Sequence, residues 1–362
     1  NKYNVVNNPK EADIIVINTC GFIESAKQEA INTILEMAEY KNEKCRFLIV
    51  MGCLVQRYKA ELEKAIPEVD LFLSIDEYEN SWKKIQSLIK DEQISRYEKL
   101  EYLRRKITTG NKMAYLKIAE GCSNRCTYCA IPYIRGPFIS RKMEDIIEEA
   151  NLLAKKGIQE LIVIAQDTTK YGIDIYGETK LAELLRKLSK IDGIKWIRFL
   201  YSYPETITDE LIEEVKNNDK ICKYFDIPIQ HISSKVLKVM NRKSNSESIR
   251  KTIKKIRENI PNVVIRTTVM VGFPGETNED FNELCEFIKE ARFEKMGAFI
   301  YSKEDGTPAS KLKNQIHHNT KKSRYNKIMK IQQEISNEIQ KSYIGKKFEV
   351  VIDSITFDNK YY

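Results

Sequence analysis

The sequence predicts an α/β protein with two larger domains, an N-terminal doubly wound parallel sheet and a partial (β/α)6 barrel. Short, continuous apolar runs recur along the chain, each followed by a loop and a helix-like stretch, which is typical of buried parallel strands. Six such units lie between residues 113 and 300, fewer than a complete eight-stranded barrel needs. The length of 362 residues favours two or three domains.

The N-terminal domain, residues 1–90, is predicted to contain three strands with helices between them. Strands are expected over residues 13–18, 47–51 and 71–74, with one helix over residues 24–40 and another after the second strand. Cys20 and Cys53 each lie just past the end of a strand. Because ligands bind at the carboxyl edge of open parallel sheets, these two cysteines are expected to converge in space.

Residues 91–112 are polar and predict a linker, and residues 113–342 predict the barrel domain. Its strands are expected over residues 114–118, 160–165, 196–201, 224–227, 263–271 and 296–300. Its helices are expected over residues 142–156, 180–191, 208–217, 233–240, 246–259 and 278–291, and a long polar helix follows over 319–342. Residues 343–362 predict the start of a small, truncated β domain. The chain starts at Asn1 without Met, from which we expect a fragment of a longer protein.

The composition indicates a protein of a reducing compartment, and we expect a cytoplasmic location. The apolar runs are too short to span a bilayer, and no secretory signal is visible. The net charge of +8 is spread along the chain among acidic residues, so RNA binding stays possible without being indicated. Eight clustered cysteines and three histidines favour a metal or cluster site over a disulfide scaffold.

Cys122, Cys126 and Cys129 form a C-x3-C-x2-C motif directly after a predicted strand. Three thiolates on one short loop can ligate three irons of a four-iron cluster and leave the fourth iron open. An open position lets a cluster bind a substrate, as it does in a catalytic zinc site. The alternative is a zinc loop in a non-catalytic, metal-stabilised binding protein. Zinc usually needs a fourth protein ligand, and no further Cys or His follows before Cys222.

The cysteine motif resembles the signature of radical S-adenosylmethionine (SAM) enzymes. In that family, SAM chelates the open iron through its amino and carboxylate groups. The resemblance implies that Tyr128 packs by the adenine and that Gly272 and Gly275, in a Gly-rich turn, allow close approach to SAM. It also implies that Arg266 pairs with the SAM carboxylate. Further expected SAM contacts are Gln166 and Asp167, near the methionyl amine, and Gln230, with His231 as a weaker candidate.

The segments around Cys20 and Cys53 resemble the N-terminal domain of radical SAM methylthiotransferases. Members of that family carry a second four-iron cluster in this domain, held by three cysteines. Cys20 and Cys53 match two of these ligands, and the third would precede Asn1. The resemblance therefore implies two 4Fe-4S clusters, of which the second lacks one protein ligand in this chain. Cys45, Cys222 and Cys285 match no motif and are predicted to be structural.

Several segments favour the RimO type, the protein-modifying branch of this family. They are residues 18–23, 165–169 and 225–231. The resemblance implies insertion of a methylthio group at the β-carbon of an aspartate in small-subunit ribosomal protein twelve, with action on the ribosome as a further expectation. It also implies an external electron donor such as a flavodoxin, and a C-terminal module of the TRAM type. A tRNA-adenosine methylthiotransferase is the alternative.

Overall fold

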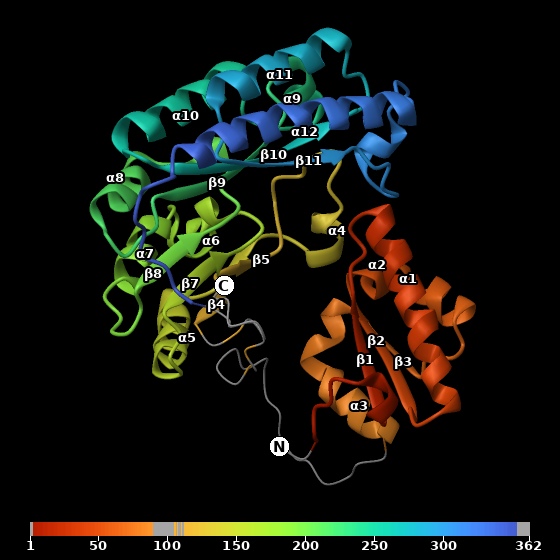
Figure 1. Ribbon diagram of the computed structural model, residues 1–362. Coiled ribbons are helices and arrows are strands. Elements are labelled where there is room, and N and C mark those ends of the chain that lie inside the picture. The colour runs from red at the N-terminus through yellow and green to blue at the C-terminus, as the bar shows by residue number, and fades with distance from the viewer. Residues whose placement is uncertain (1–2, 90–104, 106, 108–109, 111, 353–362) are drawn as a thin grey trace. The chain divides into compact units, whose positions relative to one another are not determined.

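The computed structural model describes residues 3–89, 105, 107, 110 and 112–352 (Figure 1). The chain forms two compact units. The N-terminal unit comprises residues 1–102 together with the segments 129–136 and 302–307, and the barrel unit comprises residues 103–128, 137–301 and 308–362. Sequence patterns did not indicate that the two short segments, which follow the cysteine motif and the last barrel strand, pack with the N-terminal unit.

A three-stranded parallel sheet in the order β1-β2-β3 forms the centre of the N-terminal unit. Its strands are β1 (Ile14–Thr19), β2 (Phe47–Gly52) and β3 (Leu71–Leu73), and its helices are α1 (Glu24–Ala38), α2 (Cys53–Ala65), α3 (Ser81–Ile89) and α4 (Ile131–Arg135). Leu48, Ile49 and Val50 of the middle strand are fully buried, as expected for a strand covered on both faces. The predicted parallel sheet is confirmed.

The barrel unit contains six parallel strands in two sheets, ordered β4-β7-β8 and β9-β10-β11. The strands are β4 (Met113–Lys117), β7 (Glu160–Ile164), β8 (Trp196–Phe199), β9 (Tyr224–Gln230), β10 (Val264–Val271) and β11 (Lys295–Ile300). A parallel bridge between Ile197 and Ile221, and a hydrogen bond from Ser202 N–H to the Asp226 carbonyl, connect the two sheets. All six predicted barrel strands are confirmed.

Helices follow the strands and cover their outer faces. They are α5 (Met143–Lys155), α6 (Ile173–Tyr176), α7 (Leu181–Leu188), α8 (Asp209–Asn217), α9 (Ser234–Val239), α10 (Ser246–Asn259), α11 (Asn278–Ala291) and α12 (His318–Lys341). Helices α9 to α12 lie over the β9-β10-β11 sheet (Figure 1), and α12 packs on β11 and α11. Three leucines of α7, Leu184, Leu185 and Leu188, are fully buried, and each stabilises the fold by roughly 1.5–3 kcal/mol.

Alternation along the barrel strands separates a core face from an inner face. In β10, Ile265, Val269 and Val271 belong to the hydrophobic core. Because successive side chains of a strand point to opposite sides, Arg266, Thr268 and Met270 lie on the other face. Arg266 is therefore directed away from the hydrophobic core.

Some elements were not predicted. The antiparallel pair β5 (Ala119–Glu120) and β6 (Ile139–Ser140) flanks the cysteine motif, and α3, α4 and α6 are short. Most of the expected linker and residues 353–362 lie outside the described residues. Residues 346–352 carry no strand, so the C-terminal β domain stays a prediction.

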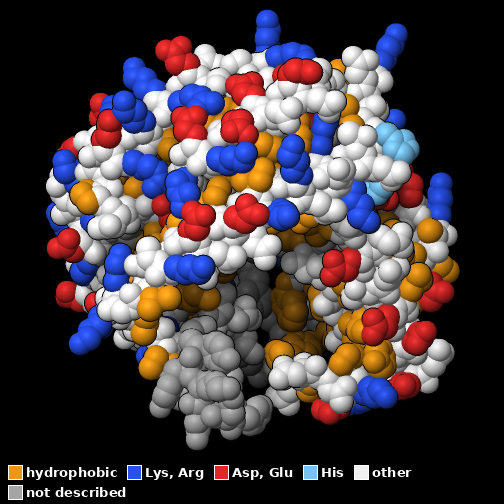
Figure 2. Space-filling model, turned by 45° about the horizontal axis from the view of Figure 1, so that its top comes forward, with side chains coloured by type: hydrophobic (Ala, Val, Ile, Leu, Met, Phe, Trp, Pro, Cys, Tyr) orange, Lys and Arg blue, Asp and Glu red, His pale blue; other side chains and the backbone are white. Residues whose placement is uncertain are grey.

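Charged side chains are mixed over the surface. Figure 2 shows Lys and Arg side chains interspersed with Asp and Glu over the outer helices of the barrel unit. This agrees with a solvated surface and gives no single-sign stripe on the face shown. Within the described part of the chain, no helix is long and apolar enough to cross a membrane.

Candidate active site

The cysteine loop, residues 121–130, follows β5 and contains neither helix nor strand. Cys122 and Cys126 are buried, Cys129 is half-buried, and none of the three forms a disulfide. Arg125 between them has a left-handed backbone with φ of 52°, which is uncommon for a side chain of this size. Such strain persists only where surrounding contacts enforce it, and it is frequent at functional sites.

Hydrogen bonds fix the loop to the barrel unit. Thr127 donates its N–H to the Met240 carbonyl at 3.0 Å and its hydroxyl to the Val239 carbonyl at 2.9 Å. The Asn124 amide donates to the Asp167 carboxylate at 2.8 Å, just beyond the end of β7. The loop is therefore held over the carboxyl ends of the barrel strands, where parallel-sheet proteins bind their ligands.

Asp167 is 1% exposed, and both of its carboxylate oxygens have partners. One accepts from Asn124 and the other from the Thr169 hydroxyl at 2.7 Å. Burial raises the pKa of this carboxyl above its ordinary value, and the two hydrogen bonds oppose that shift. Asp167 therefore helps to position the cysteine loop, and its contact with SAM stays a prediction.

Aromatic side chains border the loop. The Tyr203 hydroxyl lies 3.7 Å from the Cys126 sulfur, and the Arg242 guanidinium lies 4.1 Å from the centre of the Tyr203 ring. Tyr128 makes an edge-to-face contact with Phe273, with ring centroids 6.4 Å apart. Tyr128 thus packs against the Gly-rich turn, the segment that the resemblance places beside the adenine.

No group of three or more His, Cys, Asp or Glu side chains converges on one metal position among the described residues. Burial raises the pKa of the Cys122 thiol above its ordinary value, and bound iron would favour the thiolate form.

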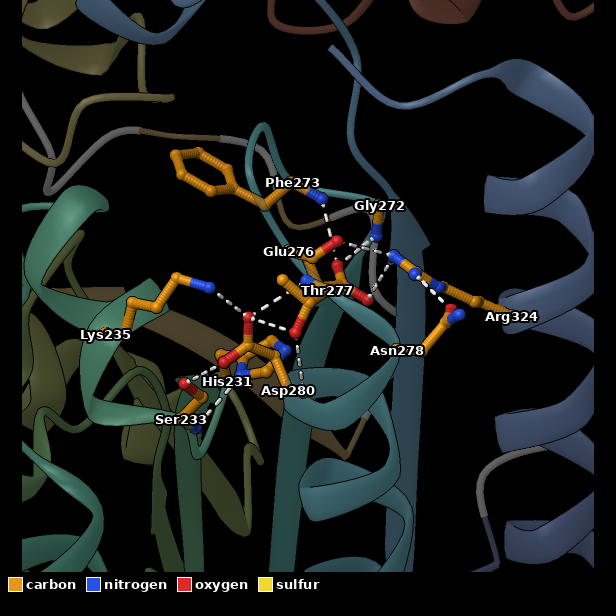
Figure 3. Close-up of polar contacts among 10 residues, drawn as sticks. All are labelled: His231, Ser233, Lys235, Gly272, Phe273, Glu276, Thr277, Asn278, Asp280 and Arg324. Atoms are coloured by element: carbon orange, nitrogen blue, oxygen red, sulfur yellow. Dashed lines mark hydrogen bonds and ion pairs between the residues drawn. The ribbon is translucent and has the colours of Figure 1, made fainter. Parts of the chain in front are cut away.

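The Gly-rich turn after β10 is closed by its own carboxylate (Figure 3). Glu276 accepts hydrogen bonds from the N–H groups of Gly272 and Phe273, the latter at 3.0 Å, and pairs with Arg324 of α12 at 3.1 Å. Burial raises the pKa of Glu276 to about 7, while Arg324 lowers it. The two N–H groups are therefore occupied within the protein.

Both glycines of this turn have a backbone conformation that favours glycine. Gly272 has φ of 73°, and a Cβ there would lie 2.3 Å from the side chain of Lys321. Gly275 has φ of 84° with open space around it, and its N–H donates to the Asn314 carbonyl at 2.8 Å. The close approach of α12 explains Gly272, and the predicted approach of SAM to the two glycines stays a prediction.

The other expected SAM contacts lie at strand ends or on the inner face. Gln166 is half-buried and donates to Glu120 at 3.4 Å, and Gln230 ends β9 with a left-handed φ of 67°. Arg266 lies on the inner face of β10, 4.0 Å from Asp226. His231 is fully buried, and burial lowers its pKa to about 3, so it is a neutral structural residue.

The N-terminal unit brings the positions of Cys20 and Cys53 together. Thr19 and Gly52 are register partners at the ends of β1 and β2, so the two cysteines follow at adjacent strand ends. A Cβ on Gly21 would lie 2.7 Å from the Leu54 backbone, and one on Gly52 would lie 2.4 Å from the Thr19 carbonyl. These two glycines allow the cysteine-bearing turns to touch.

Two arginines donate hydrogen bonds to these turns. Arg57 donates to the Gly21 carbonyl at 2.7 Å, and Arg135 of α4 donates to the Cys53 sulfur at 3.4 Å. Cys20 is exposed and Cys53 is half-buried. Neither arginine was predicted from the sequence, because their hydrogen-bond partners lie 36 and 82 residues away along the chain. Asn124 and Tyr203 were likewise not predicted.

Two sequence families match the chain. The radical SAM superfamily matches residues 116–288, and a family described as uncharacterized protein family UPF0004 matches residues 1–74. Ribosomal protein uS12 methylthiotransferase RimO of Alkaliphilus oremlandii is 65% identical over 362 residues, covering all of this chain and 82% of the relative. The protein of the same name from Clostridium botulinum strain Eklund 17B is 54% identical over 369 residues, again with 100% and 82% coverage.

The chain belongs to the RimO family of radical SAM methylthiotransferases. Solved structures agree with a radical SAM fold for this RimO-family chain. The radical SAM methyltransferase TsrM from Kitasatospora setae superposes with a TM-score of 0.63 at 12% identity, over 82% of this chain and 66% of that one. The cobalamin-dependent SAM radical enzyme OxsB gives a TM-score of 0.55 at 13% identity, over 97% and 55%.

Proposed function

We propose that this chain methylthiolates ribosomal protein uS12, at the β-carbon of an aspartate. One observation carries the proposal. The chain is 65% identical, over its whole length, to a uS12 methylthiotransferase, and Cys122, Cys126 and Cys129 of its cysteine loop form no disulfide. The tRNA-modifying activity is the alternative.

Cys122, Cys126 and Cys129 would hold a four-iron cluster with one iron left for SAM. When bound, the cluster and SAM supply the one-electron chemistry that removes hydrogen from an unactivated carbon. The protein positions this chemistry. Asn124 and Asp167 hold the loop at the strand ends, and Tyr203 and Arg242 close one side of it against water.

Cys20 and Cys53 would hold the second cluster, where the transferred sulfur resides. Their adjacent strand-end positions support this role. Arg135 donates to the Cys53 sulfur, and hydrogen bonds to ligating sulfurs tune cluster potentials. We also propose a flavodoxin-type electron donor, action on uS12 within the ribosome, and a cytoplasmic location.

The test is a methylthiolation assay with the anaerobically reconstituted chain, SAM and a chemical reductant. Purified uS12 and unmodified tRNA are offered in parallel, and the products are read by mass spectrometry. Modified uS12 with unmodified tRNA is the expected result. Modification of tRNA alone would replace the proposal by the tRNA-directed activity. A colourless preparation that binds zinc and no iron would support the metal-stabilised binding protein instead.

A further inference from the structure

Three charged residues lie side by side across the second barrel sheet. Arg266 of β10 is the register partner of Asp226 in β9 and of Lys295 in β11. Neighbouring residues of these strands, such as Ile265 and Ile227, belong to the hydrophobic core. Because register partners share a face, Asp226, Arg266 and Lys295 form a row on the inner face, here called the charged row.

Asp226 is buried with an unsatisfied oxygen. Its side chain is 2% exposed, and one carboxylate oxygen accepts from the Tyr201 N–H at 3.2 Å. The other oxygen has no hydrogen bond in the described structure, and it lies 4.0 Å from Nε of Arg266. Leaving a buried acceptor unpaired costs about 1–3 kcal/mol, so stability does not explain this arrangement of Asp226.

Arg266 is partly exposed and has more donor groups than its neighbours use. Its side chain is 45% exposed, forms an ion pair with Asp226 at 4.0 Å and hydrogen-bonds Tyr224. A guanidinium has five N–H donors, so these contacts leave donors for a ligand. The other inner-face cations are already paired, Lys117 with Glu120 at 2.5 Å and Arg198 with Glu160 at 2.9 Å.

Within the described strands, Arg266 and Lys295 are therefore the cations without a hydrogen-bonded acidic partner. With Asp226 the charged row carries a net charge of +1, which suits one carboxylate. An arginine fork can bind such a group through two parallel hydrogen bonds.

The charged row adjoins the cysteine loop through one short segment of the barrel unit. Tyr201, whose N–H reaches Asp226, has a left-handed φ of 62°. Two residues later, the Tyr203 hydroxyl lies 3.7 Å from the Cys126 sulfur. This segment therefore contacts both the charged row and the cysteine loop, and it places them in the same part of the barrel unit.

We infer that Arg266, assisted by Lys295 and oriented by Asp226, binds the carboxylate of the substrate aspartate and so fixes its β-carbon beside the cysteine loop. The inference rests on the proposed function and adds the residues that select an acidic side chain. It differs from the sequence-based expectation that Arg266 pairs with the SAM carboxylate.

The experiment is a double-mutant cycle that combines two enzymes with two substrates. The enzymes are the wild type and Arg266→Gln, and the substrates are natural uS12 and uS12 whose target aspartate is replaced by asparagine. For each combination, the methylthiolation rate is measured as a function of uS12 concentration. Formation of 5′-deoxyadenosine without uS12 is measured in parallel, because it reports SAM binding and cleavage alone. Arg250→Gln, which removes an arginine paired with Glu290 on the outer helices, is the matched control.

Loss of a charge-assisted pair is expected to raise KM for natural uS12 roughly 10- to 100-fold in Arg266→Gln. The variant should lose most of its preference for aspartate over asparagine. Arg266→Lys should recover part of the affinity, and Lys295→Gln should have a smaller effect. SAM cleavage without uS12 should stay at the wild-type rate, as should every reaction of Arg250→Gln.

Three results would overturn the inference. Loss of SAM cleavage in Arg266→Gln without uS12 would assign the arginine to SAM. An unchanged preference for aspartate in that variant would show that Arg266 does not read the carboxylate. A wild-type enzyme that cleaves SAM but leaves uS12 unmodified would overturn the proposed function and this inference with it, whereas the first two results leave the proposed function intact.

Discussion

The cysteine loop of the barrel and the cysteine pair of the N-terminal unit are built in different ways. In the loop, Cys122 and Cys126 are buried and lie on one short segment that hydrogen bonds anchor to the end of β7 and the end of α9. Cys20 and Cys53 come from different strands, and glycine contacts bring their turns together. The first site is defined by local sequence, and the second depends on the fold of a whole sheet.

The largest expected effect separates the roles of the two sites. Cys126→Ala should remove the cluster that binds SAM, and 5′-deoxyadenosine formation should fall to background. Cys20→Ala should keep SAM cleavage and lose methylthiolation, because only the second site holds the transferred sulfur. Iron content and product analysis check both variants. Cys285→Ala, which removes a buried cysteine of α11, is the control and should retain both activities. Equal loss of SAM cleavage in Cys126→Ala and Cys20→Ala would show that the two cysteine sites do not have separate roles.

Thiol reactivity after removal of iron compares the two sites directly. Cys20 is exposed, whereas Cys122 is buried and its pKa is raised by that burial. Because the thiolate is the reactive form, Cys122 should be alkylated at least about tenfold more slowly than Cys20 at neutral pH. Raising the pH should reduce the difference between the two alkylation rates, because the Cys122 thiol then deprotonates. Mass spectrometry of labelled peptides measures both rates, and equally fast labelling at neutral pH would contradict the buried position of Cys122.

Replacing Gly52, which is crowded by backbone atoms, should reduce stability more than replacing a glycine in an uncrowded turn. Gly52→Ala places a Cβ 2.4 Å from the Thr19 carbonyl at φ of 112°, and about 2–4 kcal/mol of unfolding free energy should be lost. Gly157→Ala, with φ of 87° and open space, should lose only about 1–2 kcal/mol. Urea unfolding measures the difference. A Gly52→Ala variant as stable as Gly157→Ala would show that the two cysteine-bearing turns need no close contact.

The smallest predicted effect concerns the anchoring of the cysteine loop. Asn124→Ala removes the donor to buried Asp167 and should destabilise the barrel unit by about 1–3 kcal/mol. Faster loss of iron under a chelator should accompany the lower melting temperature. The control is Asn151→Ala, because that amide donates to Ile147 within exposed helix α5. Identical iron retention in the two variants would mean that Asp167 does not position the loop.

Local patterns predicted the fold well. The barrel strands are continuous apolar runs, and the C-x3-C-x2-C motif lies in one short segment, so neither required long-range information. Gly272 shows the limit, because its neighbour Lys321 comes from a helix whose packing no local pattern reveals. Asp167 was singled out because it follows a strand, whereas its hydrogen bond to Asn124, 43 residues earlier, became visible only in the structure. Sequence patterns indicate residue types at strand ends, and the fold is needed to identify their contact partners.

The Gly-rich turn also has a consequence for the order in which the chain matures during synthesis. Glu276 leaves the ribosome before Arg324, its partner 48 residues later, exists. At about 5–20 residues per second, this carboxylate waits roughly 2 to 10 seconds for its counter-charge. Until α12 arrives, the turn beside Tyr128 holds a buried acid without its arginine. A nascent barrel that ends before α12 is thus unfinished, although all six strands are present, and the trailing helix is its final structural part.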